Sequence, residues 1–516
     1  MSHTLTLDGS SLRIEDIVKV ARSLDRVALS KESVERIGKS RSALERLANQ
    51  GKTIYGVTTG FGALSNTRIT LTQAAELQTN LLRSHACGVG DHLSSDVVRA
   101  IMLLRLNTLA KGLSGVRLEV ARLIEEFLNR GIHPVIPARG SVGASGDLAP
   151  LSHMALALIG EGTVEFQGKS MPASDALKEA KLRPLTLTMK EGLALNNGTQ
   201  VSTAVAALVV HDAEQLLRTA DIAAATSIEA LLGFTQAFDV RIQEARPFKG
   251  QSDVASNIRK MIAGSTLVGE GAMGEHESAQ DAYSLRCVPQ VMGAAREAVA
   301  FARRIIEIEI NSATDNPLIF ADTSDVLSGG NFHGQPVGLA MDVVSIALAT
   351  VANISERRTF RMLDGNQNKG LPAFLVGVKE SKGLHSGLMA VQYTAAALAS
   401  ENKVLAHPAT VDTIPTSAGM EDFVSMSPYA GLKARTILQN TQRVLAIELI
   451  CSAQALDLRG PSKSGKGTRA AYNKIRERVS MIREDRILSG DIEAITKLIS
   501  DGSILEAVDA AIGRLQ

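Results

Sequence analysis

Three consecutive residues, Ala144, Ser145 and Gly146, carry the groups that a backbone cyclisation needs. The Gly146 nitrogen can attack the Ala144 carbonyl, and loss of the ring water together with the serine hydroxyl would leave an exocyclic methylene, an electron-poor alkene. A tight turn explains the same residues, because glycine suits sharp bends and Asp147 can cap a following helix. Taken alone, the triplet favours the turn, and the surrounding sequence must decide whether it does chemistry.

Other reactive patterns are incomplete in this chain. The segment GASG, residues 143–146, is one residue short of the G-x-S-x-G turn of serine hydrolases, which weakens Ser145 as a nucleophile of that kind. The segment GPSKSGKG, residues 460–467, has glycine where a phosphate loop needs serine or threonine for magnesium. His276 and Glu277 lack the second histidine of a zinc helix, and we expect no metal site.

Long segments with helical spacing and many small residues must position any such site. Several begin at serine or aspartate and end at glycine or Asn-Pro, which is typical of helices. The segment TVEFQG, residues 163–168, indicates a short hairpin strand. We therefore expect a mainly α fold, with a long central helical bundle at residues 201–516 and a smaller, loop-rich N-terminal domain at residues 1–200. The expected helices cover residues 94–112, 114–131, 295–317, 384–408 and 432–460.

Composition and charge disfavour several classes of protein. The 516 residues include 55 Lys and Arg against 54 Asp and Glu, and a net charge of +1 argues against nucleic acid or anionic membrane as a partner. The three cysteines are far apart and predict neither a disulfide framework nor a zinc site. We see no secretory signal, and apolar stretches such as residues 343–354 are too short to span a bilayer. We expect a soluble, cytoplasmic protein.

Eight sequence blocks follow one another along nearly the whole chain: TIYGVTTGFG (53–62), SHACGVG (84–90), GSVGASGDLAPLSH (140–153), EGLALNNGTQ (191–200), QDAYSLRCVPQ (280–290), TDNPLIF (314–320), SGGNFHGQP (328–336) and SENKVLAHP (400–408). In this order they resemble the aromatic amino-acid ammonia-lyases, the family that contains histidine, phenylalanine and tyrosine ammonia-lyases. The resemblance implies that Ala144, Ser145 and Gly146 in the N-terminal domain form a 4-methylideneimidazole-5-one (MIO) group, with no external cofactor. It also implies an aspartase/fumarase-like helical architecture and a homotetramer whose active sites are shared between subunits.

The resemblance assigns roles to residues in these blocks. It makes Tyr55, in a glycine-rich loop, the base that removes a proton from the β-carbon of the substrate. Asn197 and Gln280 resemble the amides that hydrogen-bond the MIO ring oxygen or the substrate. Arg286 would pair with the substrate carboxylate, which suits a planar guanidinium, and Tyr283 would lie beside the electrophile.

Four further residues bear on the substrate. His85, Met389 and Glu421 resemble the histidine branch of the family, where a carboxylate can accept the ring N–H of an imidazole. Phe332 resembles the ring that lines the pocket near MIO. Residues 419–423, GMEDF, depart from this branch, which usually reads Asn-Gln-Glu-Asp-His, and the departure could admit tyrosine or another aromatic amino acid.

The implied reaction is the elimination of ammonia from L-histidine to give trans-urocanate. The chain is therefore expected to be a carbon–nitrogen lyase that acts on a small-molecule amino acid. A tyrosine or broad-specificity aromatic amino-acid ammonia-lyase and a 2,3-aminomutase, each with the same MIO group, stay open as alternatives. From other classes, a serine hydrolase at Ser145 and a non-catalytic helical assembly protein are kept.

Overall fold

The chain forms two compact units in this computed structural model, which describes residues 4–64, 66–70, 72–269, 280–377 and 383–516. His276 and Glu277 lie outside the described residues. The first unit comprises Met1–His211, Ala302–Asp342 and Pro408–Leu432, and the second comprises Asp212–Phe301, Val343–His407 and Lys433–Gln516. The division into domains at residue 200 stays a prediction.

Short strands occur only in the first unit, as far as the described residues go. They form a parallel pair, β1 (Thr4–Leu7) with β2 (Arg26–Leu29), and an antiparallel pair, β3 (Val89–His92) with β5 (Pro137–Arg139). A small antiparallel sheet has the order β4 (His133–Pro134), β6 (Thr163–Phe166), β7 (Lys169–Pro172), and β8 (Leu318–Phe320) pairs with β9 (Asp325–Leu327). The β6–β7 pair, in which Phe166 faces Lys169, is the predicted hairpin.

The described residues of the first unit also form eight α-helices and two 3-10 turns near the site. The helices are α1 (Ile14–Arg22), α2 (Lys31–Asn49), α3 (Ala74–His85), α4 (Ser95–Ala110), α5 (Leu118–Arg130), α6 (Leu148–Leu158), α7 (Ala173–Glu179) and α8 (Glu191–Asn196), and the turns are η1 (Gly62–Leu64) and η5 (Ser417–Gly419). Helices α4 and α5 confirm the two helices expected there. Gly131 ends α5 in the left-handed region, with φ of 69°, which is why glycine stands there.

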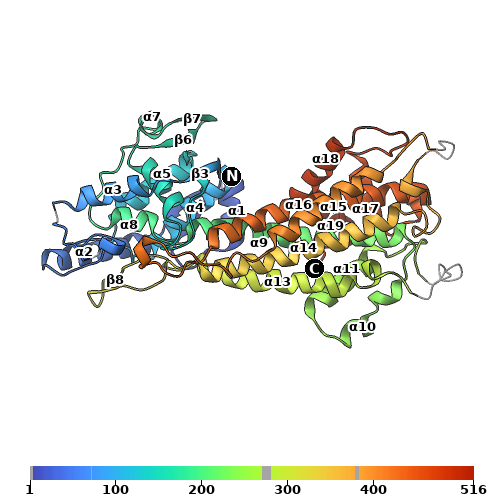
Figure 1. Cartoon of the computed structure of the whole chain (residues 1–516), viewed down its shortest axis with the longest axis horizontal. Helices are drawn as coiled ribbons and strands as arrows, with labels where there is room; N and C mark the ends of the chain where they lie inside the picture. Colours follow the sequence, from blue (N-terminus) through green and yellow to red (C-terminus); the bar gives the residue numbers. More distant parts are fainter. Residues whose placement is uncertain (1–3, 65, 71, 270–279, 378–382) are drawn as a thin grey trace. The chain divides into compact units, whose positions relative to one another are not determined.

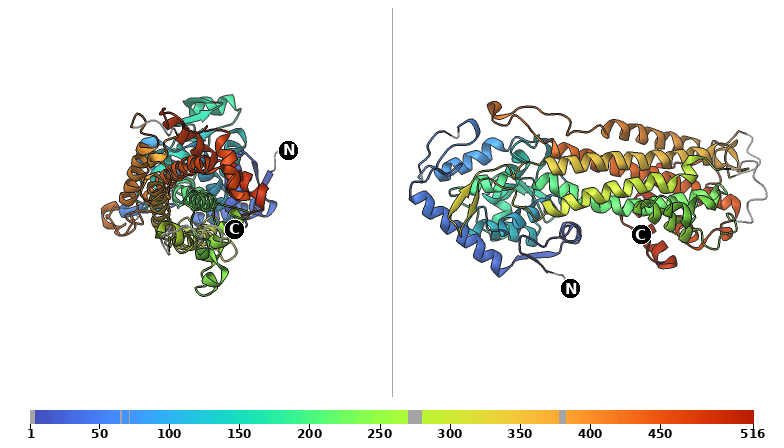
Figure 2. Two further views of the ribbon diagram at one scale, coloured as in Figure 1. Left: turned by 90° about the vertical axis from the view of Figure 1, so that its right-hand side faces the viewer. Right: turned by 90° about the horizontal axis from the view of Figure 1, so that it is seen from below.

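Long helices dominate the rest of the chain and lie alongside one another in the views of Figures 1 and 2. They are α9 (Gln200–Ala230), α13 (Val288–Glu309), α14 (Gln335–Leu363), α15 (Met389–Leu405) and α16 (Ser427–Arg459). Shorter helices complete this part of the chain: α10 (Val240–Glu244), α11 (Lys249–Met261), α12 (Tyr283–Arg286), α17 (Lys466–Arg476), α18 (Ser489–Ser500) and α19 (Ser503–Ile512). The predicted mainly α fold with a long helical bundle is confirmed.

One predicted helix ends early. Helix α13 stops at Glu309, although the sequence predicts that it continues to Asn316-Pro317. The carbonyl of Ile310 accepts a hydrogen bond from Asn107 at 2.9 Å, and the Thr314 hydroxyl accepts one from Gln200 at 2.6 Å. These contacts tie the segment after α13 to distant parts of the first unit, and local sequence does not encode them.

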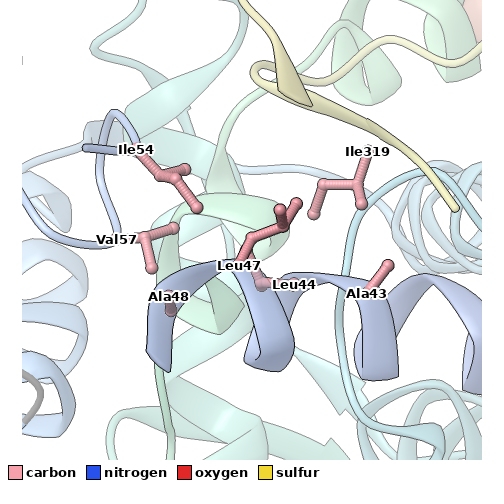
Figure 3. Packing of buried hydrophobic residues seen from close by; sticks show 7 residues of the cluster. All are labelled: Ala43, Leu44, Leu47, Ala48, Ile54, Val57 and Ile319. Atoms are coloured by element: carbon pink, nitrogen blue, oxygen red, sulfur yellow. The ribbon is translucent and has the colours of Figure 1, made fainter. Parts of the chain in front are cut away.

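A compact apolar cluster fixes α2 against the β8 strand (Figure 3). Its members are Ala43, Leu44, Leu47, Ala48, Ile54, Val57 and Ile319. The four residues from α2 recur at the spacing of one helix face, so they all point toward the same side. Full burial of a side chain such as Ile319 contributes about 1.5–3 kcal/mol. Ile54 and Val57, from the loop that carries Tyr55, belong to the cluster, so the cluster anchors both sides of that tyrosine.

Helix α14 is long and apolar enough to cross a membrane by length and composition, the one such helix among the residues described. Most of its apolar window, 72%, is buried inside the structure, as in the core helix of a soluble protein. The expectation from residues 343–354 was wrong about length, because α14 extends beyond this stretch on both sides. Its burial accounts for the apolar composition without a membrane.

An ion pair is buried between the long helices of the second unit. Arg358 of α14 donates to the Glu448 carboxylate of α16 through Nε and Nη2 at 2.5 and 2.8 Å. Ser227 and Ser355 each donate to the same carboxylate at 2.6 Å. All four side chains are buried. Because the carboxylate receives four donors, its burial is compensated.

Candidate active site

Two glycines bring the Ala144–Gly146 turn against the segment before α9. Gly146 and Gly198 form a parallel bridge, and the Asp147 N–H donates to the Gly198 carbonyl at 2.7 Å. Their φ values, 78° and 146°, lie where side chains are strained. A Cβ on Gly146 would lie 2.3 Å from the Gly198 carbonyl oxygen, and one on Gly198 would lie 2.2 Å from the Thr314 carbonyl oxygen. Only glycine permits this approach of the two backbones.

Asp147 precedes α6, but its side chain makes no capping hydrogen bond to that helix, so the predicted cap is wrong. The carboxylate instead accepts from the Ser202 N–H at 2.8 Å and from the Ser202 hydroxyl at 2.9 Å, in the first turn of α9. The close contact of Gly146 with Gly198 brings α9 within reach. Burial raises the pKa of Asp147 to about 6, although the Ser202 donors and Arg105 oppose this shift.

The polar atoms of Ser145 are held from two directions. Its hydroxyl donates a short hydrogen bond to Oε1 of Glu421, and its carbonyl accepts from Nδ2 of Asn197 at 2.8 Å. Oε2 of Glu421 accepts from the Thr416 hydroxyl at 2.7 Å. Oδ1 of Asn197 is buried and has no hydrogen-bond partner in the structure. The serine therefore lies between a carboxylate on one side and an amide on the other.

Arg105 holds the backbone of Asn197 in place and was not predicted from the sequence. Its Nη1 donates to the carbonyls of Ala194 and Asn197, both at 3.0 Å, and its Nη2 donates to Oε1 of Gln200 at 2.5 Å. The guanidinium is buried, and this burial lowers the pKa of Arg105 to about 10. The available signal was an arginine inside an otherwise apolar stretch of α4, where an unpaired charge would be costly.

Tyr55 lies in the loop between α2 and α3 and is half-buried. Its hydroxyl oxygen accepts a hydrogen bond from the Gly62 N–H at 3.0 Å. Phe61 packs edge-on against the Tyr55 ring, with ring centroids 6.3 Å apart. An N–H donor at the phenol oxygen is the contact that stabilises negative charge there. The loop therefore presents the hydroxyl in a fixed place and in a suitable environment for a base.

One cavity of about 1120 Å³ in the first unit collects most of the predicted site residues. Those that line it are Tyr55, His85, Ala144, Ser145, Asn197, Phe332 and Glu421. Gly146 is buried next to them in the turn. Leu77 and Leu81 of α3 and Leu193 of α8 add apolar walls. An apolar cavity with a few converging polar groups suits a small ring-bearing molecule.

A family model described as "Aromatic amino acid lyase" matches residues 12–477. The chain belongs to the aromatic amino acid lyases. The predicted family is therefore confirmed, and the serine hydrolase alternative has no support from this match.

Relatives of this lyase extend over its whole length. A histidine ammonia-lyase from Gloeobacter violaceus is 53% identical over 511 residues, which cover 99% of this chain and 98% of that protein. The crystal structure of histidine ammonia-lyase from Trypanosoma cruzi is 39% identical with a TM-score of 0.91, over 99% of this chain and 96% of that one. The tyrosine aminomutase from Streptomyces globisporus is also 39% identical, with a TM-score of 0.94 over 100% of both chains.

His85 of the lyase is oriented by the end of α3. Its Nδ1 lies 2.9 Å from the Leu81 carbonyl oxygen and 3.0 Å from the Ser84 hydroxyl. A carbonyl only accepts, so Nδ1 must carry a proton for this contact to be a hydrogen bond. In the neutral ring Nε2 is then an acceptor, available to a donor such as a protonated amine or an imidazole N–H.

The segment that departs from the histidine branch lies on the cavity of the lyase. Met420, Asp422 and Phe423 line it together with Glu421. The Phe423 ring stacks on His333 with a centroid distance of 6.1 Å, and Nε2 of His333 lies 3.2 Å from the Phe423 carbonyl oxygen. His333 was missed in the sequence, although it directly follows Phe332. The structure thus places three of the substituted-segment residues and Glu421 on the wall of this cavity.

Four predicted residues do not line this cavity. Gln280, Tyr283, Arg286 and Met389 belong to the second unit of the lyase. Tyr283 is 69% exposed, and the Arg286 guanidinium lies 4.7 Å from the centre of its ring. Nε of Arg286 is buried and has no hydrogen-bond partner in the structure. The cavity of one chain therefore holds the triplet, Tyr55 and Glu421, without the predicted arginine.

Proposed function

We propose that this lyase eliminates ammonia from L-histidine and releases trans-urocanate, cleaving a carbon–nitrogen bond. One observation carries the proposal: Tyr55, Ala144, Ser145 and Glu421 line the same cavity in the first unit. Full-length relatives named histidine ammonia-lyase, such as the Gloeobacter violaceus protein at 53% identity, support the choice of substrate.

We further propose that Ala144, Ser145 and Gly146 form the MIO group. The surroundings fit such a ring, because Asn197 already donates to the Ser145 carbonyl and its own Oδ1 is buried with no partner. Gly146 has no side chain that could shield its backbone nitrogen, and the packing against Gly198 leaves no space for one. When formed, the group supplies an electrophilic carbon for the amino group of the substrate.

Tyr55 acts as the base of this proposal. Its oxygen takes the proton from the β-carbon of the substrate, and the Gly62 N–H, 3.0 Å away, stabilises the charge before that transfer. Phe61 packs against the ring and limits its motion. The adjoining Leu193 and Leu81 exclude water from the apolar side of the cavity.

Glu421 and His85 are the groups that recognise an imidazole. When the Ser145 hydroxyl is lost, Oε1 of Glu421 is released from its hydrogen bond and can accept the N–H of the substrate ring. Thr416 keeps the other carboxylate oxygen in place. A phenyl ring offers no N–H and would leave this carboxylate unpaired in the cavity, which penalises phenylalanine.

The substrate carboxylate needs a cation, and Arg286 is the residue that we propose for it. Arg286, Tyr283, Gln280 and Met389 would reach the cavity from another subunit of a homotetramer, so that each active site is shared. The exposed Tyr283 ring and the partnerless Nε of Arg286 support this arrangement. A cytoplasmic location likewise stays a prediction.

A second candidate is elimination or 2,3-amino migration on tyrosine with the same MIO group. Met420 and Phe423 favour it, because they add apolar surface to the cavity where the histidine branch usually has glutamine and histidine. The 39% identity to the Streptomyces globisporus tyrosine aminomutase supports it to a lesser degree.

Ultraviolet absorbance of the purified enzyme with histidine, tyrosine or phenylalanine tests the substrate. We expect urocanate from histidine only, whereas coumarate seen by absorbance, or β-tyrosine separated from tyrosine by chromatography, would favour the second candidate. The intact mass should be two waters below that of the translated sequence. Ser145→Ala should remove this deficit and the activity, and the matched control Ser141→Ala, in the same turn, should keep the deficit. An active enzyme of unmodified mass would contradict the MIO proposal.

A further inference from the structure

We infer that Lys369 is a positioning residue for the substrate carboxylate: through an ion pair with Asp281 it holds helix α12, which carries Arg286. The inference rests on the proposed function, in which Arg286 binds that carboxylate. It adds a residue that acts through the backbone of α12 rather than on the substrate. All the residues that carry the argument belong to the second unit.

Asp281 is buried and lies one residue before the N-cap of α12. Its Oδ1 accepts from Nζ of Lys369 at 3.1 Å, and its Oδ2 accepts from the Phe234 N–H at 2.6 Å. The carbonyl of the next residue, Ala282, accepts from the Arg286 N–H at 3.1 Å. The turn that carries Arg286 is therefore built on the residue that directly follows the held carboxylate, so a shift of Asp281 moves the arginine.

Lys369 is itself fixed through its side chain and its backbone. Its Nζ also donates to the Leu232 carbonyl at 2.9 Å and lies 5.2 Å from the centre of the Phe234 ring, a cation–π distance. Arg459 donates through Nη2 to the Lys369 carbonyl at 2.8 Å and through Nε to the Ala230 carbonyl at 3.1 Å. The ammonium group therefore reaches its carboxylate partner from a backbone that is tied to the ends of α9 and α16.

The backbone conformation of Lys369 shows that the turn alone does not call for a lysine. Its φ is 55°, in the left-handed region that side chains seldom adopt and that glycine adopts freely. Strain of this kind persists where the surrounding contacts hold the residue in place. The contacts of the ammonium group, rather than the shape of the turn, therefore explain a lysine at this position.

Helix α12 depends on such an external anchor. It is a single turn of four residues, and a helix this short is unstable in water by itself. Leu285 is its buried side chain, whereas Tyr283 is exposed. Bidentate pairing of a guanidinium with a carboxylate requires a defined position and angle. Asp281 supplies a second fixed point beside Leu285, and Lys369 thereby sets the orientation of Arg286.

Binding of two ligands that differ in the carboxylate tests the inference in the full-length enzyme. Imidazolepropionate carries the ring and the carboxylate of histidine, whereas histamine carries the ring and the amine. In Lys369→Met the Kd of imidazolepropionate, measured by titration calorimetry, should rise roughly tenfold, because binding must then order α12 without one hydrogen bond between charged groups. The Kd of histamine should be unchanged. Equal weakening of both ligands, or weakening of neither, would overturn the inference.

Three further variants show where a failure lies. Lys260→Met is the matched control, since Lys260 also belongs to the second unit and donates to a backbone carbonyl, that of Arg514 at 3.2 Å. It should bind both ligands as wild type does. Lys369→Arg keeps a cation with several donors and should restore most of the affinity for imidazolepropionate. Arg286→Met is the reference and should weaken imidazolepropionate at least as much as Lys369→Met.

The reference separates the two proposals. If Arg286→Met binds imidazolepropionate normally, the carboxylate site of the proposed function is wrong and the inference fails with it. If Arg286→Met weakens that ligand and Lys369→Met does not, only the role of Lys369 is rejected. Should tyrosine prove to be the substrate, hydroxyphenylpropionate and tyramine replace the two ligands in the same comparison.

Lys369→Gly covers the case in which Lys369→Met does not fold. Glycine relieves the φ of 55°, so this variant should unfold nearer to the urea concentration of wild type. It should nevertheless lose affinity for imidazolepropionate by roughly tenfold, because the ammonium group is gone. Stability and carboxylate binding then separate, which a purely structural role would not produce. A glycine variant that keeps wild-type affinity for imidazolepropionate would overturn the inference.

Discussion

The triplet site of the first unit and the helical bundle of the second unit bury polar groups by opposite means. Around Gly146 and Gly198 the backbones themselves touch, and side chains are excluded by contacts as short as 2.2 Å from an added Cβ. In the bundle, Arg358 and Glu448 reach across from regular helices and form a buried ion pair through two hydrogen bonds. The first arrangement requires that Gly146 and Gly198 have no side chain, and the second requires two charged side chains.

Because of this difference, the two regions tolerate different substitutions. At the site, the polar groups are placed by backbone geometry, so a single added methyl group should displace all of them together. In the bundle, the helices persist without any one side chain, and the cost of a substitution is the cost of an uncompensated charge. The expected cost of a substitution therefore depends on which kind of contact it breaks.

Gly198→Ala should have the largest effect. Its Cβ would lie 2.2 Å from a backbone oxygen at a φ of 146°, and we expect a loss of unfolding free energy of roughly 4 kcal/mol or more, or no folded protein. The matched control is Gly131→Ala, which also has positive φ, 69°, but no atom within 4 Å of the added Cβ. It should cost about 1–2 kcal/mol in urea titrations. Equal costs would contradict the importance of close backbone approach.

Glu448→Gln should come next, with a loss of roughly 3–5 kcal/mol, because it removes the carboxylate that pairs directly with the buried Arg358. The control is an exposed ion pair between α16 and α18: Arg443 and Glu493 form a pair at 2.8 Å whose side chains are 36% and 59% exposed. Glu493→Gln should cost less than about 1 kcal/mol. If the two variants shift the thermal midpoint equally, burial does not set the cost in the bundle.

Asp147→Asn should have the smallest effect, and this effect is seen in how the unfolding free energy depends on pH. The folded-state pKa, about 6, lies above the ordinary value of 3.8, so this group's contribution is fully present below about pH 4 and is lost as the pH rises through 6. Between about pH 5 and pH 7 wild type should lose roughly 1 kcal/mol relative to the variant. Urea titrations at both pH values measure this difference, and parallel curves would contradict it.

The sequence predicts elements well where local signals decide. Apolar spacing locates α4 and α5, and Gly131 marks where α5 ends, although α5 begins at Leu118 rather than at the predicted Ser114. It fails where distant side chains decide, as at the early end of α13, which Asn107 and Gln200 enforce. No local pattern within residues 295–317 contains that information.

The site shows the same contrast between local signals and distant contacts. The triplet and Tyr55 could be selected because their neighbours form long, specific blocks. The Ser145–Glu421 hydrogen bond could not, since it joins residues 276 positions apart with no shared pattern. The Asp147 side chain was predicted to cap α6, but the approach of Gly198 brings the Ser202 N–H within hydrogen-bond distance of its carboxylate instead. Arg105 was hidden by the apolar residues around it, although its burial makes it a fixed support for Asn197.

The close approach of the Gly146 and Gly198 backbones allows the molecules that have folded to be counted by their mass. Ser145 meets Asn197, 52 residues away, only after the surrounding unit has assembled. If dehydration of the triplet requires that contact, each chain that has formed the MIO group keeps a permanent loss of mass, which shows that it once folded. A sample denatured long afterwards would still report, by mass alone, what fraction of its molecules had ever reached the native state.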